Sequence, residues 1–562
     1  MTATETPPEA HEKLEAHSET EPHAQSNDGL YRLIASNDHK DVGRLWIGAS
    51  LFFFVLLVGL GVVNDAERIS TDPEIFGSTS LAFQGWVLFR TAAIFLVVIP
   101  MFLGIATAVT PLQVGSASIA FPRLAAASFW AWFIGSIIHI ISFIADGGLG
   151  PAQTTSVEST LLTMSSLGFI ILAILGSSIC ISTTVVALRP SGMSLIEVPA
   201  FSWSMLVACS IWLVSLPVLV AGLILSYVDL QGRAFIEFGN PELLWERVEW
   251  AWAQPQVFAY AIPVLGVLAE ILPVKTKSRQ AARPALLGMI TMFGALSFGA
   301  WAQSFYSKGA DELVSSALIY DELLYILFGL AIFLPAFGAF SGAMDQARRG
   351  SFPKPDGAFI GAVSGALLLL GATVAGEARV LAGLLDLVGL DVGWSALESD
   401  GVLLSSSTGI LLLVVASAMA SAIGALVFWA PKIFGGYAIE PLAMLGAMAM
   451  LGGGAAAGVA NMVSAFAGQP DDVRFVTDVS GIIATMNLVS AVGVGLIGAG
   501  ALATILAIIP ASRSGETLPD DPWDGHTLEW ASPSPPPAGN FIEPVGVVRS
   551  AEPMLDEIEE VI

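Results

Sequence analysis

Polar side chains interrupt one long apolar segment at a point where an ordinary membrane helix carries Leu or Val. The segment runs from Trp250 to Pro273, and its middle reads Gln254-Pro255-Gln256. Proline breaks a helix's hydrogen-bond pattern, and neighbouring helices must then satisfy the freed carbonyl. Two glutamine amides beside it could hydrogen-bond across helices or bind a polar ligand inside a bundle. Contact between helices is the simpler interpretation, and a new polar site is the alternative.

Histidine is the nitrogen donor that suits iron and copper, and the chain contains only 6 histidines. His139 is the one that falls inside a predicted span. The others lie in the tails or at the entry to the first span: His11, His17, His23, His39 and His526. A lone histidine in a span is expected to hydrogen-bond to a neighbour, and metal ligation is the alternative.

A third candidate, Arg90, places a charge inside another apolar segment. Such a charge costs about 2.5–3.5 kcal/mol on insertion scales, so it needs a partner or water. It could pair with a carboxylate or with carbonyls inside the bundle. Alternatively, it could snorkel to the membrane surface if its helix begins later than predicted. We therefore name Arg90, Gln256 and His139 as the candidate functional polar residues.

The elements that must position these residues are membrane helices. Of the 562 residues, 54% are hydrophobic and 13% are charged, and the mean hydropathy is +0.74, which excludes an ordinary soluble globule. Apolar runs near the ~20 residues needed to cross a bilayer recur along the chain. We predict an all-α polytopic membrane bundle of about twelve helices. They are placed near 44–64, 84–109, 124–146, 161–187, 201–228, 250–273, 284–305, 318–343, 357–376, 402–430, 441–466 and 479–510.

The net charge of −25 is concentrated in the two tails. Residues 1–43 hold 9 acidic and 3 basic residues, and residues 511–562 hold 11 acidic and 2 basic residues. Both tails are rich in Pro, Glu, Ser and Thr, which predicts little stable structure. The expected domains are an acidic N-terminal tail (1–43), a transmembrane domain (44–510) and an acidic Pro-rich C-terminal tail (511–562). Nucleic acid is excluded as a partner, and the lipid bilayer is expected.

Basic residues gather in every second loop, which predicts that both termini are cytoplasmic in a plasma-membrane protein. These residues are Arg123, Arg189, Lys275, Lys277, Arg279, Arg283, Arg348, Arg349, Lys354 and Lys432. The first thirty residues are acidic and have no apolar core typical of a signal peptide. The two cysteines, Cys180 and Cys209, lie within spans and are expected to be packing residues.

Five stretches, in order along the chain, resemble subunit I of the haem-copper oxidases, the cytochrome c oxidase family. "SNDHKDVGRLWIGASLFFFVLLVGLGVVNDAERIS" is similar to the first helix and "TPLQVGSASIAFPRLAAASFW" to the loop between the second and third helices. "AQPQVFAYAIPVLGVLAEILP" resembles the sixth helix, which reads HPEVY and then SEIIP in the family. "FWAPKIFGG" and "DPWDGHTLEWASPSPPPAGNF" resemble the end of the tenth helix and the C-terminal signature. The resemblance covers almost the whole chain.

The resemblance implies a subunit I-like helix bundle, which in the family binds two haems and a copper through six histidines. When the motifs are matched residue by residue, another residue stands at each of the six histidine positions. The positions that match haem ligands are Phe89, Gly409 and Leu411, and those that match copper ligands are Gln254, Gln303 and Ser304. Gln256 and Phe258 stand at the family's proton-delivering Glu and cross-linked Tyr.

Supporting residues differ as well. The family's arginine pair that holds haem propionates matches Asp471 and Asp472, and carboxylates there would repel propionates. Ser118 and Ala125 stand where the family has an Asp and an Asn of a proton channel. From these replacements we expect no bound haem, copper or other cofactor and no catalytic residue.

Three functions follow. The first is a non-catalytic structural or assembly component that associates with other membrane subunits of a respiratory oxidase, inactive on its own. The second is a working cytochrome c oxidase subunit I with unusual ligands. The third is an emptied bundle reused as a small-molecule or ion carrier, for which Arg90 and the glutamines are the hints.

Overall fold

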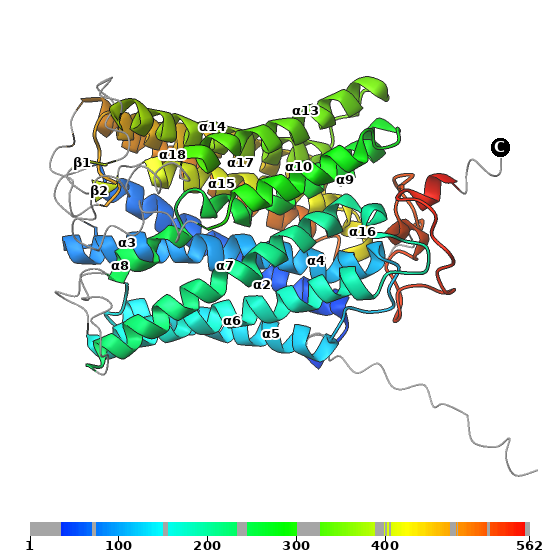
Figure 1. Ribbon diagram of the computed structural model, residues 1–562, viewed down its shortest axis with the longest axis horizontal. Coiled ribbons are helices and arrows are strands. Elements are labelled where there is room, and N and C mark those ends of the chain that lie inside the picture. Colours follow the sequence, from blue (N-terminus) through cyan, green and yellow to red (C-terminus); the bar gives the residue numbers. More distant parts are fainter. Residues whose placement is uncertain are drawn as a thin grey trace, which may run out of the picture. The chain divides into compact units, whose positions relative to one another are not determined.

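The structure is a computed structural model that describes residues 35–69, 75–149, 156–232, 244–299, 326–387, 398–399, 402–403, 406–472, 479, 481–513 and 518–556. Gln303 and Ser304 lie outside these residues. Asn37–Ile562 form one compact unit. Its long helices run side by side along one axis (Figure 1).

Ten helices within the described residues are long and apolar enough to cross a membrane. They are α2 (His39–Glu67), the continuous helix Thr79–Gln113, α5 (Pro122–Ile144), α6 (Val157–Ala187), α7 (Ala200–Leu230), Ile326–Arg349 with α13 (Phe333–Arg349), α14 (Gly357–Leu387), α15 (Ser406–Phe428), α17 (Glu440–Phe466) and α18 (Gly481–Ile508). The helix Thr79–Gln113 consists of α3 (Thr79–Ala92), a π-helical turn η1 (Ala93–Val98) and α4 (Ile99–Gln113). Two shorter helices, α9 (Ile262–Thr276) and α10 (Arg283–Leu296), overlap the sixth and seventh of the predicted spans, 250–273 and 284–305. The predicted all-α membrane bundle of about twelve helices is confirmed.

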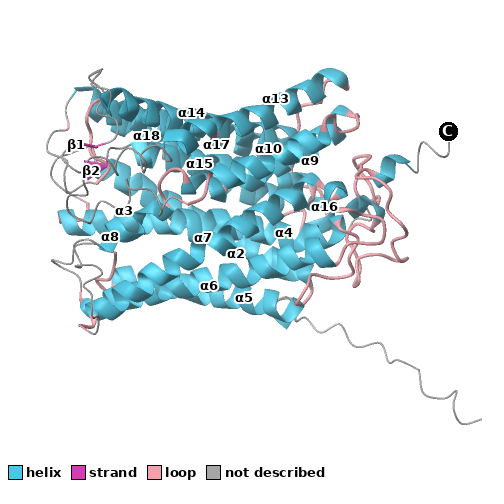
Figure 2. Ribbon diagram, viewed as in Figure 1, coloured by secondary structure: helices cyan, strands magenta, loops and turns pink. Residues whose placement is uncertain are grey.

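The predicted helix 250–273 is wrong over its first half. The chain there forms the short α8 (Leu244–Val248) and the 3₁₀ turns η4 (Glu249–Ala251) and η5 (Gln256–Tyr260), and α9 begins only at Ile262. Pro255 cannot donate a backbone hydrogen bond, and Pro263 in the first turn of α9 suits a helix start. The one departure from helix and loop in the described residues is a two-residue hairpin, in which β1 (Glu398–Ser399) pairs antiparallel with β2 (Val402–Leu403) (Figure 2).

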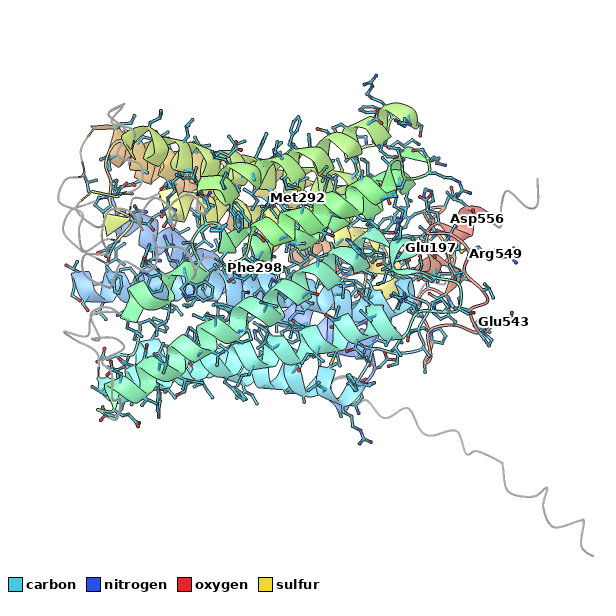
Figure 3. All side chains as sticks on the ribbon, viewed as in Figure 1. Glu197, Met292, Phe298, Glu543, Arg549 and Asp556 are labelled. Carbon is cyan, nitrogen blue, oxygen red and sulfur yellow. The ribbon has the colours of Figure 1, made fainter. Side chains whose placement is uncertain are left out.

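Small residues let the helices approach closely. A Cβ added at Gly361 in α14 would lie 2.4 Å from the backbone nitrogen of Gly424 in α15. A Cβ at Gly453 in α17 would lie 2.5 Å from the carbonyl oxygen of Gly493 in α18. Such contacts are the main source of helix association in lipid, where no hydrophobic driving force acts between helices. Larger side chains fill the remaining space between the ribbons (Figure 3).

The C-terminal segment, defined here as Leu518–Asp556, is ordered and packs against the bundle, so the prediction of little stable structure there was wrong. Leu528 and Val548 join a buried cluster with Val114, Val185, Met193 and Val198. The ring of Trp530 is 1% exposed. Prolines and turns give this segment no helical or strand periodicity, so its buried anchors could not be recognised from pattern alone.

Basic loops share one end of the bundle with the C-terminal segment, and we call this the basic end. Two ion pairs join them: Lys277 Nζ lies 3.5 Å from Asp524 Oδ2, and Arg279 Nη2 lies 2.8 Å from Asp556 Oδ1. Val548 donates a backbone hydrogen bond to Ser191, which follows α6 (3.0 Å). The opposite end carries β1 and β2 and is called the hairpin end (Figure 1).

Lys432, in the short α16 (Ala430–Ile433), anchors the C-terminal segment at the basic end. Its Nζ donates hydrogen bonds to the carbonyl oxygens of Asp520 (2.9 Å) and Ser532 and lies 5.3 Å from the ring centroid of Trp530. Burial lowers the pKa of Lys432 from 10.5 to about 8, although the charge of Glu529 opposes this shift. The folded protein therefore releases this proton more readily than the unfolded chain does.

The lowered pKa of Lys432 makes the free energy of unfolding depend on pH in the alkaline range. Below the lowered pKa both states carry the charge, and the cost of burying it is fully present. Between about pH 8 and 10.5 the unfolded chain binds more protons, so this group's contribution to the free energy of unfolding rises with pH. We expect the wild type to gain thermal stability relative to Lys432→Met between about pH 7 and about pH 10. Unfolding midpoints that change in parallel for both proteins would contradict this assignment.

Candidate functional site

Phe89, at the first position matched to a haem ligand, is an aromatic packing residue of α3. Its side chain is 6% exposed. A Cβ added at Gly61 in α2 would lie 2.8 Å from a carbon of the Phe89 ring, so the ring packs directly against the α2 backbone. The phenyl ring of Phe89 therefore occupies the space beside Gly61 of α2, and it has no atom that could bind a metal.

Gly409 and Leu411 lie near the start of α15, every residue of which is buried. A Cβ at Gly409 would lie 2.9 Å from the carbonyl oxygen of Gly458 and 3.2 Å from the Cβ of Asn461, both in α17. The α15 and α17 backbones therefore touch where the family would place a histidine. A larger side chain at Gly409 could be accommodated only if the two helices moved apart.

Gln254 and Gln256 have separate surroundings around the break before α9. Gln254 is 1% exposed, and Cβ atoms added at Gly329 and Gly376 would lie 3.3 and 2.9 Å from its Nε2, so its amide packs closely against both glycines. Gln256 is fully buried, and its Nε2 donates a hydrogen bond to the Ser215 hydroxyl of α7 (3.1 Å). The interpretation of Gln256 as a contact between helices is confirmed.

Arg90 forms a buried ion pair across the bundle. Its guanidinium bonds to the carboxylate of Asp471 and donates to the hydroxyl of Thr408 (2.7 Å) and that of Ser407 (3.2 Å). The two charged side chains are 3% and 1% exposed. The guanidinium carbon also lies 4.2 Å from the ring centroid of Trp86, one turn earlier in α3. The alternative that Arg90 snorkels is wrong, since α3 begins at Thr79 and the charge stays inside.

Asp471 serves two groups at once. Its Oδ1 accepts the backbone N–H of Thr408 (3.3 Å), which belongs to the first turn of α15 and has no partner within that helix. Its Oδ2 accepts from Arg90. A carboxylate is favourable at a helix N-terminus, so the residue stabilises both the start of α15 and the arginine of α3. Where the resemblance expects an arginine that faces a propionate, this chain has a carboxylate that faces its own arginine.

A second polar network links α2, α17 and α18, and it includes the carbonyl group of Pro470, the residue before Asp471. Arg68 donates to the Oδ1 of Asn461 (3.1 Å) and to the carbonyl of Pro470 (3.3 Å). Asn461 donates to the Ser490 hydroxyl (2.8 Å), which donates to Asp65 (2.6 Å). The helices here are held by complementary charges and amides of the chain itself.

His139 lies in α5 with both ring nitrogens in contact with hydroxyl groups. Nδ1 is 3.0 Å from the Oγ of Ser166 in α6, and Nε2 is 3.2 Å from the Oγ1 of Thr91 in α3. The ring is fully buried, and its centroid lies 5.2 Å from the ring centroid of Phe143. The interpretation of His139 as a hydrogen-bonded packing residue is confirmed.

Replacing His139 with Leu should therefore affect folding through lost hydrogen bonds. We expect a loss of about 1–3 kcal/mol in the free energy of unfolding, because the replacement removes both of these contacts from a buried site. The measurement is unfolding in detergent, with Phe143→Leu, which loses only a ring contact, as the matched comparison. An unchanged stability for His139→Leu would contradict the structural role.

The side chains at the matched positions do not fit haem or copper. Within the described residues these positions hold a phenyl ring, a glycine, a leucine and an amide, none of which replaces imidazole as a donor. The contact between Gly409 and Gly458 leaves no room for a ligand side chain there. The described part of the chain also has no group of three or more His, Cys, Asp or Glu placed to hold a metal ion.

Several buried polar residues were not singled out from the sequence. Arg379 is fully buried in α14, whose predicted span ended at 376, whereas the helix continues to Leu387. The signal that could have found it is the pair Glu377 and Arg379 within an otherwise apolar run. Arg68, Asp65 and Asn461 were missed because their partners come from distant parts of the chain.

Comparisons with known proteins agree with this bundle. The model of the family described as "Cytochrome C and Quinol oxidase polypeptide I" matches residues 41–384. The chain is 26% identical to cytochrome c oxidase subunit 1 of Bacillus subtilis (strain 168), over 93% of this chain and 83% of that protein. It is also 26% identical to the probable cytochrome c oxidase subunit 1-beta of Nocardia farcinica (strain IFM 10152), over 95% and 89% of the two chains.

A solved structure supports the fold independently. A chain from a cryo-EM structure of a heme-copper terminal oxidase dimer superposes with a TM-score of 0.64 at 12% sequence identity, over 85% of both chains. The bundle is thus that of a haem-copper oxidase-like membrane protein. The chain belongs to the cytochrome c and quinol oxidase polypeptide I family.

Proposed function

We propose that this chain is a non-catalytic member of its family that acts as a structural or assembly component beside other membrane subunits of a terminal oxidase. The observation that carries the proposal is the direct contact of α15 and α17 at Gly409, at a position matched to a haem ligand. Helix packing has taken the place of a cofactor there. The sequence similarity over more than nine-tenths of the chain favours a retained place in an oxidase complex.

The proposal includes no resident haem or copper and no electron transfer through the chain. The donor set at Phe89, Gly409, Leu411 and Gln254 supports this, as does the Arg90–Asp471 pair at a position matched to the propionate contact. We further propose a plasma-membrane location with both termini cytoplasmic, because the basic loops share one end of the bundle.

The test is a purification of the tagged full-length chain from its native membrane in mild detergent. We expect other oxidase subunits, including a ligand-complete subunit I, to co-purify. Stripped of those subunits, the chain should not consume O₂ with reduced cytochrome c. Oxygen consumption by the isolated chain would support the alternative of an oxidase with unusual ligands. Recovery of the chain without any oxidase subunit would also contradict the proposal.

A further inference from the structure

A cavity of about 100 Å³ lies between α9, α10 and α13. Its walls are mainly apolar, with large side chains on α9 and small residues on α13; among them are Leu268, Leu272, Ala285, Met289, Gly338 and Gly342. This volume is several times the ~10–15 Å³ that one water requires, and water in an apolar cavity lacks the polar partners it needs. The cavity therefore suits a hydrocarbon ligand.

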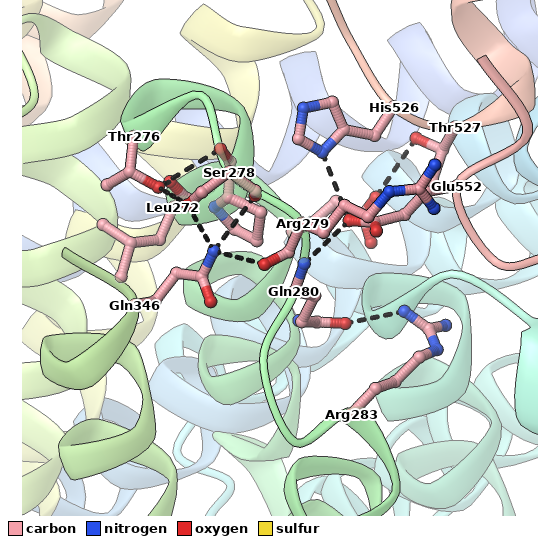
Figure 4. A network of polar contacts seen from close by, with 12 residues as sticks. Leu272, Thr276, Ser278, Arg279, Gln280, Arg283, Gln346, His526, Thr527 and Glu552 are labelled. Carbon is pink, nitrogen blue, oxygen red and sulfur yellow. Dashed lines mark hydrogen bonds and ion pairs between the residues drawn. The ribbon is translucent and has the colours of Figure 1, made fainter. Parts of the chain in front are cut away.

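The two polar side chains of the lining are both hydrogen-bonded, and that of Gln346 is turned to the loop between α9 and α10 (Figure 4). Gln346 donates from Nε2 to the carbonyl oxygens of Ser278 (3.0 Å) and Arg279 (2.7 Å), and its Oε1 accepts the N–H of Ala281 (2.8 Å). Gln280 donates to the carbonyl oxygen of Ala269 (2.8 Å). These bonds tie the loop to α9 and α13 at the basic end of the cavity, and they leave its apolar walls to receive a ligand.

The cavity is accessible from the outer face of the bundle. Ala285 on α10 and Gly342 on α13 are both exposed. A Cβ added at Gly342 would meet no atom within 4 Å. Met292, 42% exposed, lies two turns along α10 from Ala285 (Figure 3). In a membrane this face meets acyl chains, so a lipid can enter between α10 and α13.

Positive charge lies beside the basic end of the same groove. Gly342, Gln346 and Arg349 follow the four- and three-residue spacing of one helix face. Arg348 and Lys354 are exposed, and the side chain of Arg349 is 65% exposed while it pairs with Asp345 at 2.6 Å. One acid among three bases leaves a net positive patch, which suits a lipid phosphate.

We propose that this cavity binds a segment of one acyl chain of an anionic phospholipid, the rest of which lies in the surrounding bilayer and whose headgroup phosphate lies against Arg349 and its basic neighbours. An apolar cavity that opens to lipid and has room for a short stretch of hydrocarbon, with cations at its interfacial end, suits both parts of such a molecule. The site lies outside the positions matched to haem and copper ligands and does not depend on the proposed function.

The test compares lipid binding to the full-length protein and four variants. Delipidated protein in detergent is titrated with phosphatidylglycerol or phosphatidylcholine, and bound lipid is counted by native mass spectrometry. Gly342→Leu fills the cavity. Gly288→Leu is the matched control, because Gly288 in α10 also has open space around a Cβ but does not line the cavity. Ala285→Leu fills the cavity from the opposite wall, and Arg349→Gln removes one headgroup contact.

We expect one phosphatidylglycerol per chain at the lowest lipid concentrations. Its affinity should fall about tenfold or more in Gly342→Leu and stay unchanged in Gly288→Leu. Arg349→Gln should weaken phosphatidylglycerol about fivefold and phosphatidylcholine clearly less, because the choline cation already neutralises the phosphate of phosphatidylcholine. If Gly342→Leu does not fold, Ala285→Leu decides the result. Unchanged phosphatidylglycerol binding in a folded cavity-filled variant, or equal binding of both lipids by the wild type, would overturn the proposal.

Discussion

Replacing Arg90 with methionine is expected to lower the free energy of unfolding by about 3–5 kcal/mol, because it leaves the Asp471 carboxylate buried without its counter-charge. The two side chains are 3% and 1% exposed, so solvent cannot compensate for the loss. Asp471→Asn should have an effect of the same order, since the guanidinium then lacks its anion. The measurement is unfolding in detergent micelles, followed by helix content.

A double variant separates the pair from its members. Arg90→Met with Asp471→Leu removes both charges and should recover most of the lost stability, because isosteric apolar pairs often replace buried ion pairs without loss. Lys277→Met is the control, since its ion pair with Asp524 is 71% and 79% exposed and is expected to change stability by less than about 1 kcal/mol. Equal losses in the single and double variants would show that the pairing does not hold α3 to the hairpin end of α15.

Restoring a histidine at Gly409 is expected to destabilise the protein and to create no haem site. The new Cβ alone would lie 2.9 Å from the Gly458 carbonyl oxygen, a backbone atom that cannot rotate away. Overpacking of this kind costs about 1–3 kcal/mol or more. Gly409→Ala should share much of this loss. Gly371→Ala, at a helical glycine of α14 with no atom within 4 Å of a Cβ, should be neutral or slightly stabilising.

Haem binding and stability are measured on the same preparations. A stable Gly409→His protein would contradict the close packing of α15 on α17, whether or not it bound haem. A Gly409→Ala protein as stable as Gly371→Ala would contradict it equally.

The transmembrane architecture was predictable because each span carries its own signal in roughly 20 apolar residues. The break before α9 was visible as Gln254-Pro255-Gln256, but its extent was not, since proline marks a break without fixing where the helix resumes. The C-terminal segment failed as a prediction for a different reason. Its order depends on burying Leu528 in a cluster with Val114 and Val185, more than 300 residues earlier in the chain. It also depends on packing Trp530 against Phe428 of α15.

The candidate site was predictable in its residue types but not in its partnerships. Asp471 was recognised as the wrong charge for a propionate, whereas its pairing with Arg90, 381 residues away, required the folded bundle. Gly409 was recognised as a position without a ligand, but the sequence does not show which helix packs against this glycine. Arg379 was missed because hydropathy ended its span too early.

The most direct test of the central claim is the haem and copper content of the purified full-length chain, expressed in a host that makes the oxidase haems, together with its reduced-minus-oxidised optical spectrum. The account predicts a folded protein with far less than one haem and one copper per chain and no haem bands. Stoichiometric haem and copper with a reversible redox spectrum would contradict it and would favour an oxidase with unusual ligands.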